Sequence, residues 1–530
     1  MKHLFRTTLP FVLVAIAFCL VISVVALGQE TTGTISGLVK DQNGGILAGA
    51  RVTLADPSRG LQRTYQTTED GTFTATQLPA SIYTLTVERQ GFKKHVEEKF
   101  TLNVNDRRNL DIVLVPGQVT ELVTVVSDAS LIQDSPTQRG LISGNQITEL
   151  PLNTRNFVQL ALLSAGVSSA NAAQIGSGAL SVVQLSINGG RTSAINWLVD
   201  GARNVDTGSN LTLLTTPSID AIQEFTILTS NYAPEFGRNG GGVINVVTRS
   251  GSNNFHGTLY EFIRNDALNA RPTFQLTPLA GINKANGEPR FKAPLRYNDY
   301  GFTVGGPIYL PRFGEGGRSV YNGKNRSFFF YSQEWKKTKS VNTAVGTVPT
   351  AQQRAGVIAG AVRDPLTGLS FPLVGGNSII PVERFDPNAV AILNFIPLPN
   401  EFSPGSTTNF NRFRRAVPVA SKIRQEILRI DHNFNSNWSI FGRYIREDFS
   451  RNDPGGNQFQ DPFGLGALAG TLYPNVAAQK TTTPGKNFVV SLKTIVSPTV
   501  INELAYDYAF NAIFTTFAGT GLRSNAPGFT

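Results

Sequence analysis

The sequence predicts a mainly β protein with several domains, and three observations support this prediction. The chain has 530 residues, of which 51 are glycine, 29 proline and 34 phenylalanine, against one methionine and three tryptophans. Charged residues make up 16% of the chain, compared with roughly 25% in a typical soluble domain. Apolar and polar residues alternate in short segments that end at glycine or proline, which is the pattern of strands. The composition argues against a coiled coil, a helical bundle or a disordered chain.

Several kinds of chemistry have few candidate residues in this chain. The single cysteine, Cys19, lies in an apolar N-terminal run, so we expect no disulfide, cysteine–zinc site, iron–sulfur cluster or cysteine catalysis. The four histidines, which are His3, His95, His256 and His432, do not have metal-ligand spacing. We therefore expect no metal site and no cofactor. The net charge of +10 is spread along the chain, which does not favour nucleic-acid binding.

The N-terminus has the features of an export signal. Lys2 and Arg6 precede an apolar run over residues 11–27, and residues 26–28 (Ala-Leu-Gly) supply small side chains at a cleavage position. Residues 1–28 are therefore predicted to be a cleaved signal peptide, with a membrane anchor as the alternative. No other segment approaches the ~20 apolar residues of a spanning helix, so a mature chain in a membrane would have to be a β-barrel.

Residues 31–116 are predicted to form a β-sandwich of about seven strands. Tyr83, Leu85 and Val87 share one face of a strand, and turn residues recur about every ten positions. The stretch contains, in order, the motifs Gly33-Thr34-Ile35-Ser36-Gly37, Thr68-Glu69-Asp70-Gly71-Thr72-Phe73, Leu78-Pro79, Tyr83-Thr84-Leu85 and Gly91-Phe92.

These motifs resemble the carboxypeptidase regulatory-like family. The resemblance implies a transthyretin-like fold, related to carbohydrate-binding-like folds, without catalysis of its own. The domain is expected to act as a spacer, with binding of a glycan or a periplasmic partner as the alternative.

Residues 117–140 are predicted to be a linker that contains one short strand. Pro116 and Gly117 end the sandwich, and residues 128–140 are polar without a clear pattern. Between them, residues 120–127 (TELVTVVS) favour extended structure. Taken alone, this segment is either a last strand of the sandwich or a free strand that pairs with the sheet edge of a partner.

Residues 141–251 carry an ordered set of motifs. These are LPLNTRNFVQL from Leu150, SINGGR from Ser186, WLVDG from Trp197, IQEF from Ile222, NYAPEFGR from Asn231 and GGGVINVVTRSG from Gly240. The set resembles the plug domain of TonB-dependent outer-membrane receptors, closest to the Oar-like subgroup that carries an N-terminal regulatory-like domain. The resemblance implies a mixed α/β plug.

The same resemblance assigns a role to the short strand upstream. It implies a TonB box that a TonB-type energy-coupling protein in the periplasm binds as an added strand, formed by Glu121, Leu122, Val123, Thr124, Val125 and Val126. The glycine run at 240–242 is expected to lead the chain from the plug into the barrel wall. No Gly-Lys-Ser/Thr sequence follows that run, so a nucleotide-binding loop is not expected.

Residues 252–530 are predicted to form the N-terminal part of a transmembrane β-barrel. Segments of about ten residues alternate in hydrophobicity, as transmembrane strands do. Leu428 and Ile430 alternate with Arg429 and Asp431, for example. The alternative is a large soluble β-sandwich.

Long and short connections alternate in this stretch. Residues 272–294, 338–381 and 450–484 are expected to be external loops, because outer-membrane barrels have long external loops and short periplasmic turns. The family's barrel has about 22 strands, whereas this stretch allows only about eight to twelve. We therefore expect a piece of a longer protein, with an incomplete barrel around the plug.

Together these features predict an outer-membrane receptor that imports a ligand with the proton gradient relayed by the inner-membrane coupling complex. The ligand is expected to be an iron chelate, an oligosaccharide or a peptide, and the sequence does not identify the residues that bind it. The alternative is a surface adhesion or interaction protein on the same scaffold without active transport. An enzyme is not expected, because charges that face the barrel lumen explain the acids Asp431 and Asp448.

Overall fold

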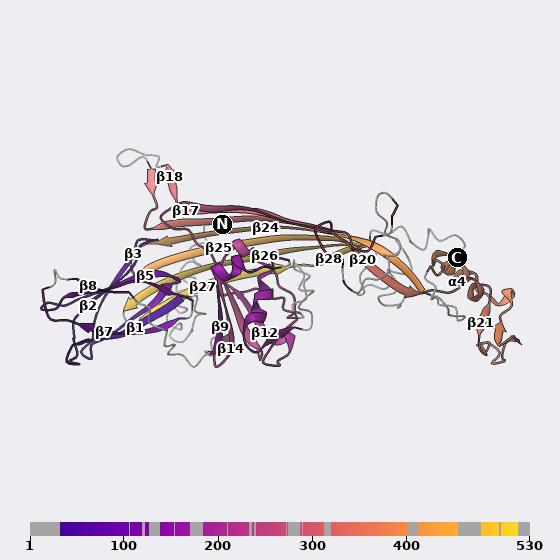
Figure 1. Cartoon of the computed structure of the whole chain (residues 1–530), viewed down its shortest axis with the longest axis horizontal. Coiled ribbons are helices and arrows are strands. Elements are labelled where there is room, and N and C mark those ends of the chain that lie inside the picture. Colours follow the sequence, from indigo (N-terminus) through magenta and orange to yellow (C-terminus); the bar gives the residue numbers. More distant parts are fainter. Residues whose placement is uncertain are drawn as a thin grey trace, which may run out of the picture.

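Three parts follow one another along the chain: a sandwich, a plug and a long curved sheet (Figure 1). The predicted signal peptide and Glu121 lie outside the described residues. The computed structural model describes residues 32–104, 106–118, 122–126, 138–152, 154–169, 184–208, 210–232, 236–237, 240–271, 273, 287–288, 290–311, 320–400, 412–453, 479–497 and 500–517.

The N-terminal part is a sandwich of two sheets, as the sequence predicts. One sheet has the strand order β4-β1-β7 and the other β3-β2-β5-β6-β8. Strand alternation turns Ile35, Leu85 and Phe100 into the core between the sheets. Tyr83 is buried among them, and its hydroxyl donates to the Pro79 carbonyl at 2.8 Å. The strands are β1 (Thr32–Asp41), β2 (Arg51–Asp56), β3 (Leu61–Gln66), β4 (Thr72–Pro79), β5 (Ser81–Glu88), β6 (Lys94–Leu102) and β7 (Arg107–Leu114).

An eighth strand, β8 (Leu122–Val126), extends the second sheet of the sandwich. Its backbone runs parallel to β6, from the pair Lys94 and Leu122 to the pair Glu98 and Val126. The strand that the sequence places in a linker is therefore not free, and it pairs as a last strand of the sandwich. The edge of β6 offers backbone donors and acceptors, and a β-prone segment close in sequence satisfies them.

The plug is built on a five-stranded sheet with the order β13-β12-β15-β14-β9. Phe157 packs edge-on against Phe225 with ring centroids 5.7 Å apart, in a core that also holds Trp197 and Ile244. The elements are β9 (Gln138–Ser143), α2 (Gly144–Glu149), η2 (Phe157–Leu163), β10 (Val167–Ser169), β11 (Leu185–Ile187), η4 (Thr192–Ala194), β12 (Ile195–Val199), β13 (Ala202–Arg203), η5 (Ile219–Ala221), β14 (Ile222–Ser230) and β15 (Gly242–Thr248).

The glycine run at 240–242 does not lead into the barrel wall, and that prediction is wrong. It leads into β15, which pairs parallel with β12 and antiparallel with β14 and is buried along its whole length. A strand buried on both faces reads as a continuous apolar run rather than an alternating one. Residues 243–247 (Val-Ile-Asn-Val-Val) have largely that character. The chain joins the wall only at β16 (His256–Asn265).

The wall is an eight-stranded antiparallel sheet in the order β16-β17-β20-β24-β25-β26-β27, with β28 also paired to β26. Within the described residues it does not close on itself, which confirms the expected incomplete barrel; the plug lies beneath its middle (Figure 1). The remaining strands are β17 (Leu295–Pro307), β20 (Ser327–Thr347), β24 (Arg412–Asn433), β25 (Trp438–Asp453), β26 (Gln479–Ser497), β27 (Val500–Asn511) and β28 (Phe514–Phe517).

Two wall strands are much longer than expected, with 21 residues in β20 and 22 in β24. Residues 338–347, predicted to begin an external loop, are therefore strand and pair with β24. The polar sequence of these residues gives no strand signal. They can still form a strand, because the hydrogen bonds between strands join backbone groups and do not depend on the side chains.

The rest of that predicted loop contains short elements of its own. No helix in the described ranges is long and apolar enough to cross a membrane. The short elements are α3 (Ala351–Arg354), β21 (Val357–Ala359), β22 (Leu373–Val374), β23 (Asn377–Ile379), η7 (Val382–Arg384) and α4 (Pro387–Phe395), and a separate hairpin is formed by β18 (Tyr309–Pro311) and β19 (Val320–Asn322).

Alternate residues of each wall strand face the plug and the outer side. Ile427 of β24 joins the plug core, whereas Leu428 is exposed on the outer face. Asp431 shares the inward face, as predicted. Asp448 does not: it lies opposite Arg424 on the outer face and pairs with Arg446 at 2.9 Å. The prediction for Asp448 is wrong because β25 turns its odd-numbered residues inward, and a shift of one position reverses the face.

The wall approaches the plug so closely at Gly485 that no side chain fits. A Cβ there would lie 2.0 Å from the carbonyl oxygen of Leu214 in the plug. Gly485→Ala should therefore displace the 213–216 segment, at a cost of about 1–3 kcal/mol. Faster hydrogen–deuterium exchange in that segment would report the displacement.

The matched control is Gly442→Ala on the outer face. A Cβ at Gly442 meets only an ordinary contact, 3.6 Å from Cγ2 of Val490. Equal exchange rates in the two variants would contradict close packing of the plug against this wall.

Candidate functional site

A sharp turn at Asp200 presents a carboxylate from the plug to the wall. Asp200 and Gly201 connect β12 to β13 and have φ angles of 49° and 81°. Two positive φ angles are what a two-residue hairpin turn requires, and Asp-Gly is a favoured pair there. The Asp200 carboxylate accepts hydrogen bonds from the backbone N–H of Thr248 at 2.9 Å and from its hydroxyl at 2.8 Å. Contacts within the plug therefore orient the Asp200 carboxylate independently of the wall residues that bind it.

Two arginines of the wall bind this carboxylate. Arg443 of β25 donates from Nε to Asp200 Oδ2 at 2.9 Å, and Arg429 of β24 donates from Nη1 to Oδ1 at 3.2 Å. Arg443 also donates to the Val199 carbonyl at 2.6 Å and to Oδ1 of Asn487 at 2.5 Å. Every partner of Arg443 lies in the plug or on the neighbouring wall strand β26.

Burial makes this contact sensitive to loss of one partner. The side chains of Arg443 and Asp200 are 0% and 1% exposed. The attraction between two buried charges is largely offset by the free energy of removing both from water. Removal of one partner, however, leaves an uncompensated buried charge and destabilises the structure by about 3–5 kcal/mol. The contact therefore specifies where the plug docks more than it adds net stability.

A second contact anchors the loop before η5 to the same two strands. The backbone N–H of Thr216 donates to Oε2 of Glu447 at 2.7 Å, and that of Ser218 donates to Oε1 of Gln425 at 2.7 Å. Gln425 also donates to Glu447 at 2.9 Å. Wall side chains thus replace the partners that a buried loop backbone would otherwise lack.

A third contact is a chain of charges across β17 and β20. Arg155 of the plug pairs with Asp220 at 2.5 Å and with Asp299 of the wall at 3.3 Å. Lys336 lies 3.8 Å from Asp299 and 2.8 Å from Glu334. The apolar part of the interface is small by comparison, because the wall side chains that join the plug core are Phe330, Ile427 and Ile445.

The sandwich docks against the plug and the ends of the wall strands. Glu224 of β14 accepts a hydrogen bond from the backbone N–H of Val104 at 2.5 Å, and Arg139 of β9 forms an ion pair with Asp106. Arg59 donates to the Ser250 hydroxyl at 2.8 Å.

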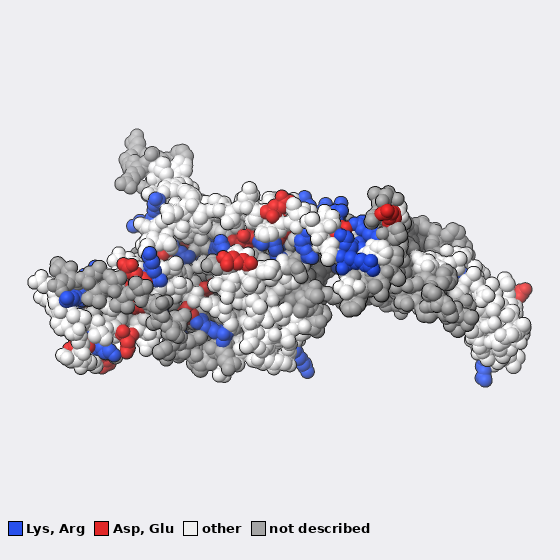
Figure 2. All heavy atoms as spheres, in the orientation of Figure 1, with Lys and Arg blue, Asp and Glu red and all other residues white. Residues whose placement is uncertain are grey.

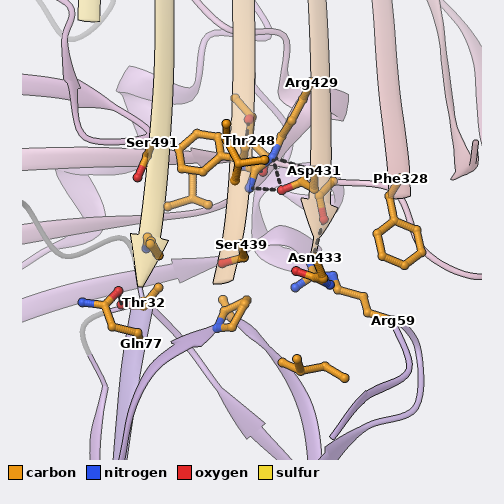
Figure 3. Close-up of a pocket in the computed structure, with 18 of the residues that line it drawn as sticks. Thr32, Arg59, Gln77, Thr248, Phe328, Arg429, Asp431, Asn433, Ser439 and Ser491 are labelled. Atoms are coloured by element: carbon orange, nitrogen blue, oxygen red, sulfur yellow. Dashed lines mark hydrogen bonds and ion pairs between the residues drawn. The ribbon is translucent and has the colours of Figure 1, made fainter. Parts of the chain in front are cut away.

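A cavity of about 90 Å³ lies at this junction. Residues of the sandwich and ends of wall strands face each other across it, with Arg429 bonded to Asp431 on the wall side (Figure 3). The sandwich therefore covers the same end of the wall at which the plug is anchored.

Burial is the main reason why the pKa of Glu224 is raised from 4.5 to about 7; the N–H of Val104 lowers the pKa and the nearby charge of Asp106 raises it by smaller amounts. The carboxyl thus binds a proton more tightly in the docked state than in water. Its contribution to docking is complete below about pH 4.5 and is lost as pH rises through about 7.

The strand predicted to be the TonB box has a defined backbone position. Residues 122–126 lie at the edge of the sandwich sheet as β8, and Glu121 lies outside the described residues. The described residues contain no cluster of His, Cys, Asp or Glu that could hold a metal ion. Sequence reasoning identified the WLVDG motif that contains Asp200 but missed its partners Arg429 and Arg443. The available signal is local: Arg429 stands between the apolar residues Leu428 and Ile430, which lie on the opposite face of the strand.

The Asp200 contact can be tested with a double-mutant cycle. Asp200→Ala should weaken plug docking by about 3–5 kcal/mol, because Arg443 is left buried without its carboxylate. Adding Arg443→Met removes the orphaned charge and should recover part of the loss. Urea-induced release of the plug, followed by hydrogen exchange in β12 and β13, measures both. Asp70→Ala, at an exposed turn, is the control, and a double variant no more stable than Asp200→Ala would contradict the ion pair.

The Glu224 contact predicts a pH dependence of sandwich docking. Docking should weaken by up to about 3 kcal/mol between pH 5 and pH 8, because the docked state favours the protonated carboxyl. Energy transfer between labels on Thr68→Cys and Lys324→Cys would follow the separation of sandwich and wall. Glu224→Gln should remove the pH dependence. A pH dependence that persists in that variant would assign the effect to another group.

Comparison with known proteins adds two family matches. The family described as outer membrane beta barrel domain matches residues 247–529, and the family described as carboxypeptidase regulatory-like domain matches residues 34–115. The first covers more than half of the chain. The second covers the sandwich.

One curated relative and two solved structures are also similar. The TonB-dependent transporter Oar of Myxococcus xanthus is 30% identical over 292 residues, which are 52% of this chain and 25% of that protein. The chain thus spans about a quarter of that relative's length. A mutant of the ferric enterobactin receptor PfeA from Pseudomonas aeruginosa covers 71% of this chain and 41% of its own, at 12% identity and a TM-score of 0.35. Catechol 1,2 dioxygenase from Acinetobacter radioresistens covers 20% of this chain and 57% of its own, at 14% identity and a TM-score of 0.15.

Because the outer membrane beta barrel model covers more than half of the chain, the chain belongs to that family, and part of it is similar to a TonB-dependent transporter.

Proposed function

We propose that this chain is part of an Oar-like TonB-dependent receptor that imports a ligand across the outer membrane, driven by a TonB-type protein that pulls on residues 121–126. The observation that carries the proposal is the position of β8 next to the plug in the sequence. β8 ends at Val126, and the plug sheet begins at Gln138 with β9. A pull on β8 therefore reaches β9 before any other strand of the plug.

The edge position of β9 suits it to being displaced first. In the plug sheet β9 pairs only with β14, and Arg139 of β9 bonds to the sandwich through Asp106 and the Val104 carbonyl. An edge strand can separate by losing one ladder of hydrogen bonds, whereas a central strand must lose two. Separation of β9 would loosen the plug and the sandwich together.

The edge position of β8 suits it to binding a partner strand. β8 pairs only with β6 among the described strands, so its second edge can accept one more strand. Added strands bind mainly through backbone hydrogen bonds, which tolerate a variable sequence. A periplasmic coupling protein could therefore engage β8 without first unfolding the sandwich.

The polar plug–wall interface supports displacement rather than permanent closure. The Asp200, Thr216 and Ser218 contacts are hydrogen bonds and ion pairs whose groups water can satisfy once the plug begins to move. Apolar side chains that separate from each other gain no comparable interaction with water, so a large apolar interface would oppose displacement of the plug. In the proposal, water enters as β9 separates, and the plug then shifts to open a passage.

The ligand in this proposal is an iron chelate, an oligosaccharide or a peptide that binds at the external side. The alternative function, adhesion without transport, makes a different prediction for residues 122–126. Import requires them, whereas surface binding does not.

Deletion of residues 122–126 from the whole receptor should abolish uptake and leave surface binding intact. Cells are given a labelled ferric chelate, an oligosaccharide and a peptide in turn, and both surface-bound and internal label are measured. Thr124→Ala is the control, since it keeps the backbone groups of the strand and should retain uptake. Full uptake by the deletion variant would overturn the proposal and favour adhesion.

A further inference from the structure

Five basic residues gather at one level of the outer face of the wall. Lys337 of β20 lies opposite Lys422 of β24, and Arg446 of β25 lies opposite Lys486 of β26. Arg424 is on the same face as Lys422, two positions along β24. All five are exposed and face away from the plug. These residues are named the outer basic cluster, and Figure 2 shows Lys and Arg side chains gathered over this part of the sheet.

Acidic neighbours neutralise only part of this charge. Arg446 pairs with Asp448 at 2.9 Å, and Arg424 pairs with Glu426. Both carboxylates lie on the same outer face as the cluster. Two of the five positive charges therefore have partners.

The other three charges have no carboxylate partner among the described residues. These are Lys337, Lys422 and Lys486, whose ammonium groups form no ion pair there. Lys337 lies over the ring of Tyr300, with Nζ 5.1 Å from the ring centroid. Unpaired charges next to the hydrocarbon layer are costly, so three unpaired positive charges on a membrane-facing surface favour binding of an anion from outside the chain.

The cluster lies at the far boundary of an apolar band. One row of the band runs Leu428, Tyr444, Phe488 and Tyr508 across four neighbouring strands. Strands rise about 3.3 Å per residue, so the steps from Trp438 to Arg446 span roughly 26 Å along the strand, and a tilt of about 40° reduces this to roughly 20 Å of the ~25 Å band of outer-membrane barrels.

The boundary is the external one. The short turn at residues 434–437 and the docked sandwich lie at the other end of the strands, and short turns of outer-membrane barrels are periplasmic. Tyr300 and Trp335 stack at the level of the cluster, with ring centroids 5.5 Å apart. Aromatic side chains of this kind mark the interface between lipid and water.

A groove beside the cluster completes the site. It has a volume of about 420 Å³ and combines cations, hydroxyls and apolar surface. Its lining includes Trp335, Lys337, Lys422, Arg424, Ser450 and Phe514.

We propose that the outer basic cluster and this groove bind the phosphorylated glycolipid of the outer leaflet. Its phosphates would bind Lys337, Lys422 and Lys486, and its acyl chains would lie along the apolar band below. Ammonium and guanidinium groups are the usual protein partners of phosphate. A soluble anion would match the cations alone, whereas an anionic lipid matches the cations and the adjoining apolar rows. This inference is independent of the proposed import function.

The test uses the full chain in detergent micelles with bisphosphorylated lipid A as the probe. Lys337→Gln, Lys422→Gln and Lys486→Gln are combined in one variant, and bound lipid is counted by native mass spectrometry. Each basic residue near an anionic surface contributes on the order of 1 kcal/mol, so the three together should lower affinity about a hundredfold. The fluorescence of Trp335 should respond to lipid in the parent chain and not in the variant.

The controls separate lipid binding from charge in general. Arg51→Gln, Arg107→Gln and Lys324→Gln remove three exposed charges elsewhere and should leave the affinity unchanged. Dephosphorylated lipid should bind the parent chain as weakly as lipid A binds the triple variant, and free inorganic phosphate should not displace lipid A.

Three results would overturn the proposal: unchanged affinity in the triple variant, equal loss in the control, or displacement of lipid A by phosphate alone. Hydrogen exchange across β24 and β25 checks that the triple variant keeps its fold. If that variant does not fold, Lys422→Gln alone should still lower affinity about fivefold, and no change would overturn the proposal equally.

Discussion

The carboxylate of Asp200 is the point at which the turn, the plug and the wall depend on one another. The turn needs two positive φ angles at Asp200 and Gly201, and Thr248 holds the carboxylate from within the plug. Arg443 is buried with this carboxylate, the Val199 carbonyl and Asn487 as its hydrogen-bond acceptors. A buried guanidinium without these partners would be costly, so the wall strand β25 and the plug constrain each other's position. The contact of Glu447 with Thr216 follows from that placement, since Glu447 lies on the same inward face of β25.

A plug must be held in place and still be displaceable, and the kind of contact decides whether both are possible. Apolar contacts lose their stabilisation in proportion to the area exposed. Hydrogen bonds exchange protein partners for water at a small net cost, but only if water can enter. The plug keeps most of its apolar core internal, around Phe157 and Phe225. Three wall side chains, Phe330, Ile427 and Ile445, join that core, and the other contacts described between plug and wall are made by charges and amides. Such an interface holds the plug firmly while water is excluded from it, and it loses most of its stabilising effect once water enters.

The sequence predicts each part of this fold by a different physical signal. Alternation and turns predict the sandwich, because one buried face per strand leaves a period of two. The same signal fails at residues 338–347, where β20 continues without an apolar face, and at 240–242, where β15 is buried on both faces. Asp448 faces outward because it shares the even-numbered face of β25 with Tyr444, so the alternation of the strand, applied along its whole length, gives the correct side. Arg443 and Asp200 are 243 residues apart, and no local sequence pattern records a contact at that separation. Alternation shows that Arg443 faces inward but not which carboxylate it meets.

Alternation in the wall strands also assigns two chemistries to one stretch of sequence. On β24 and β25 the odd-numbered residues carry the polar groups that dock the plug, including Arg429 and Arg443. The even-numbered residues carry the apolar band and, above it, Arg424 and Arg446. A slip of one residue in either strand would place an arginine in the hydrocarbon layer and an apolar side chain against Asp200. Both errors are costly, so the plug and the membrane select the same register from opposite faces of the sheet. The register that docks the plug is therefore the same register that gives the outer face its apolar band, and neither face can form correctly without the other.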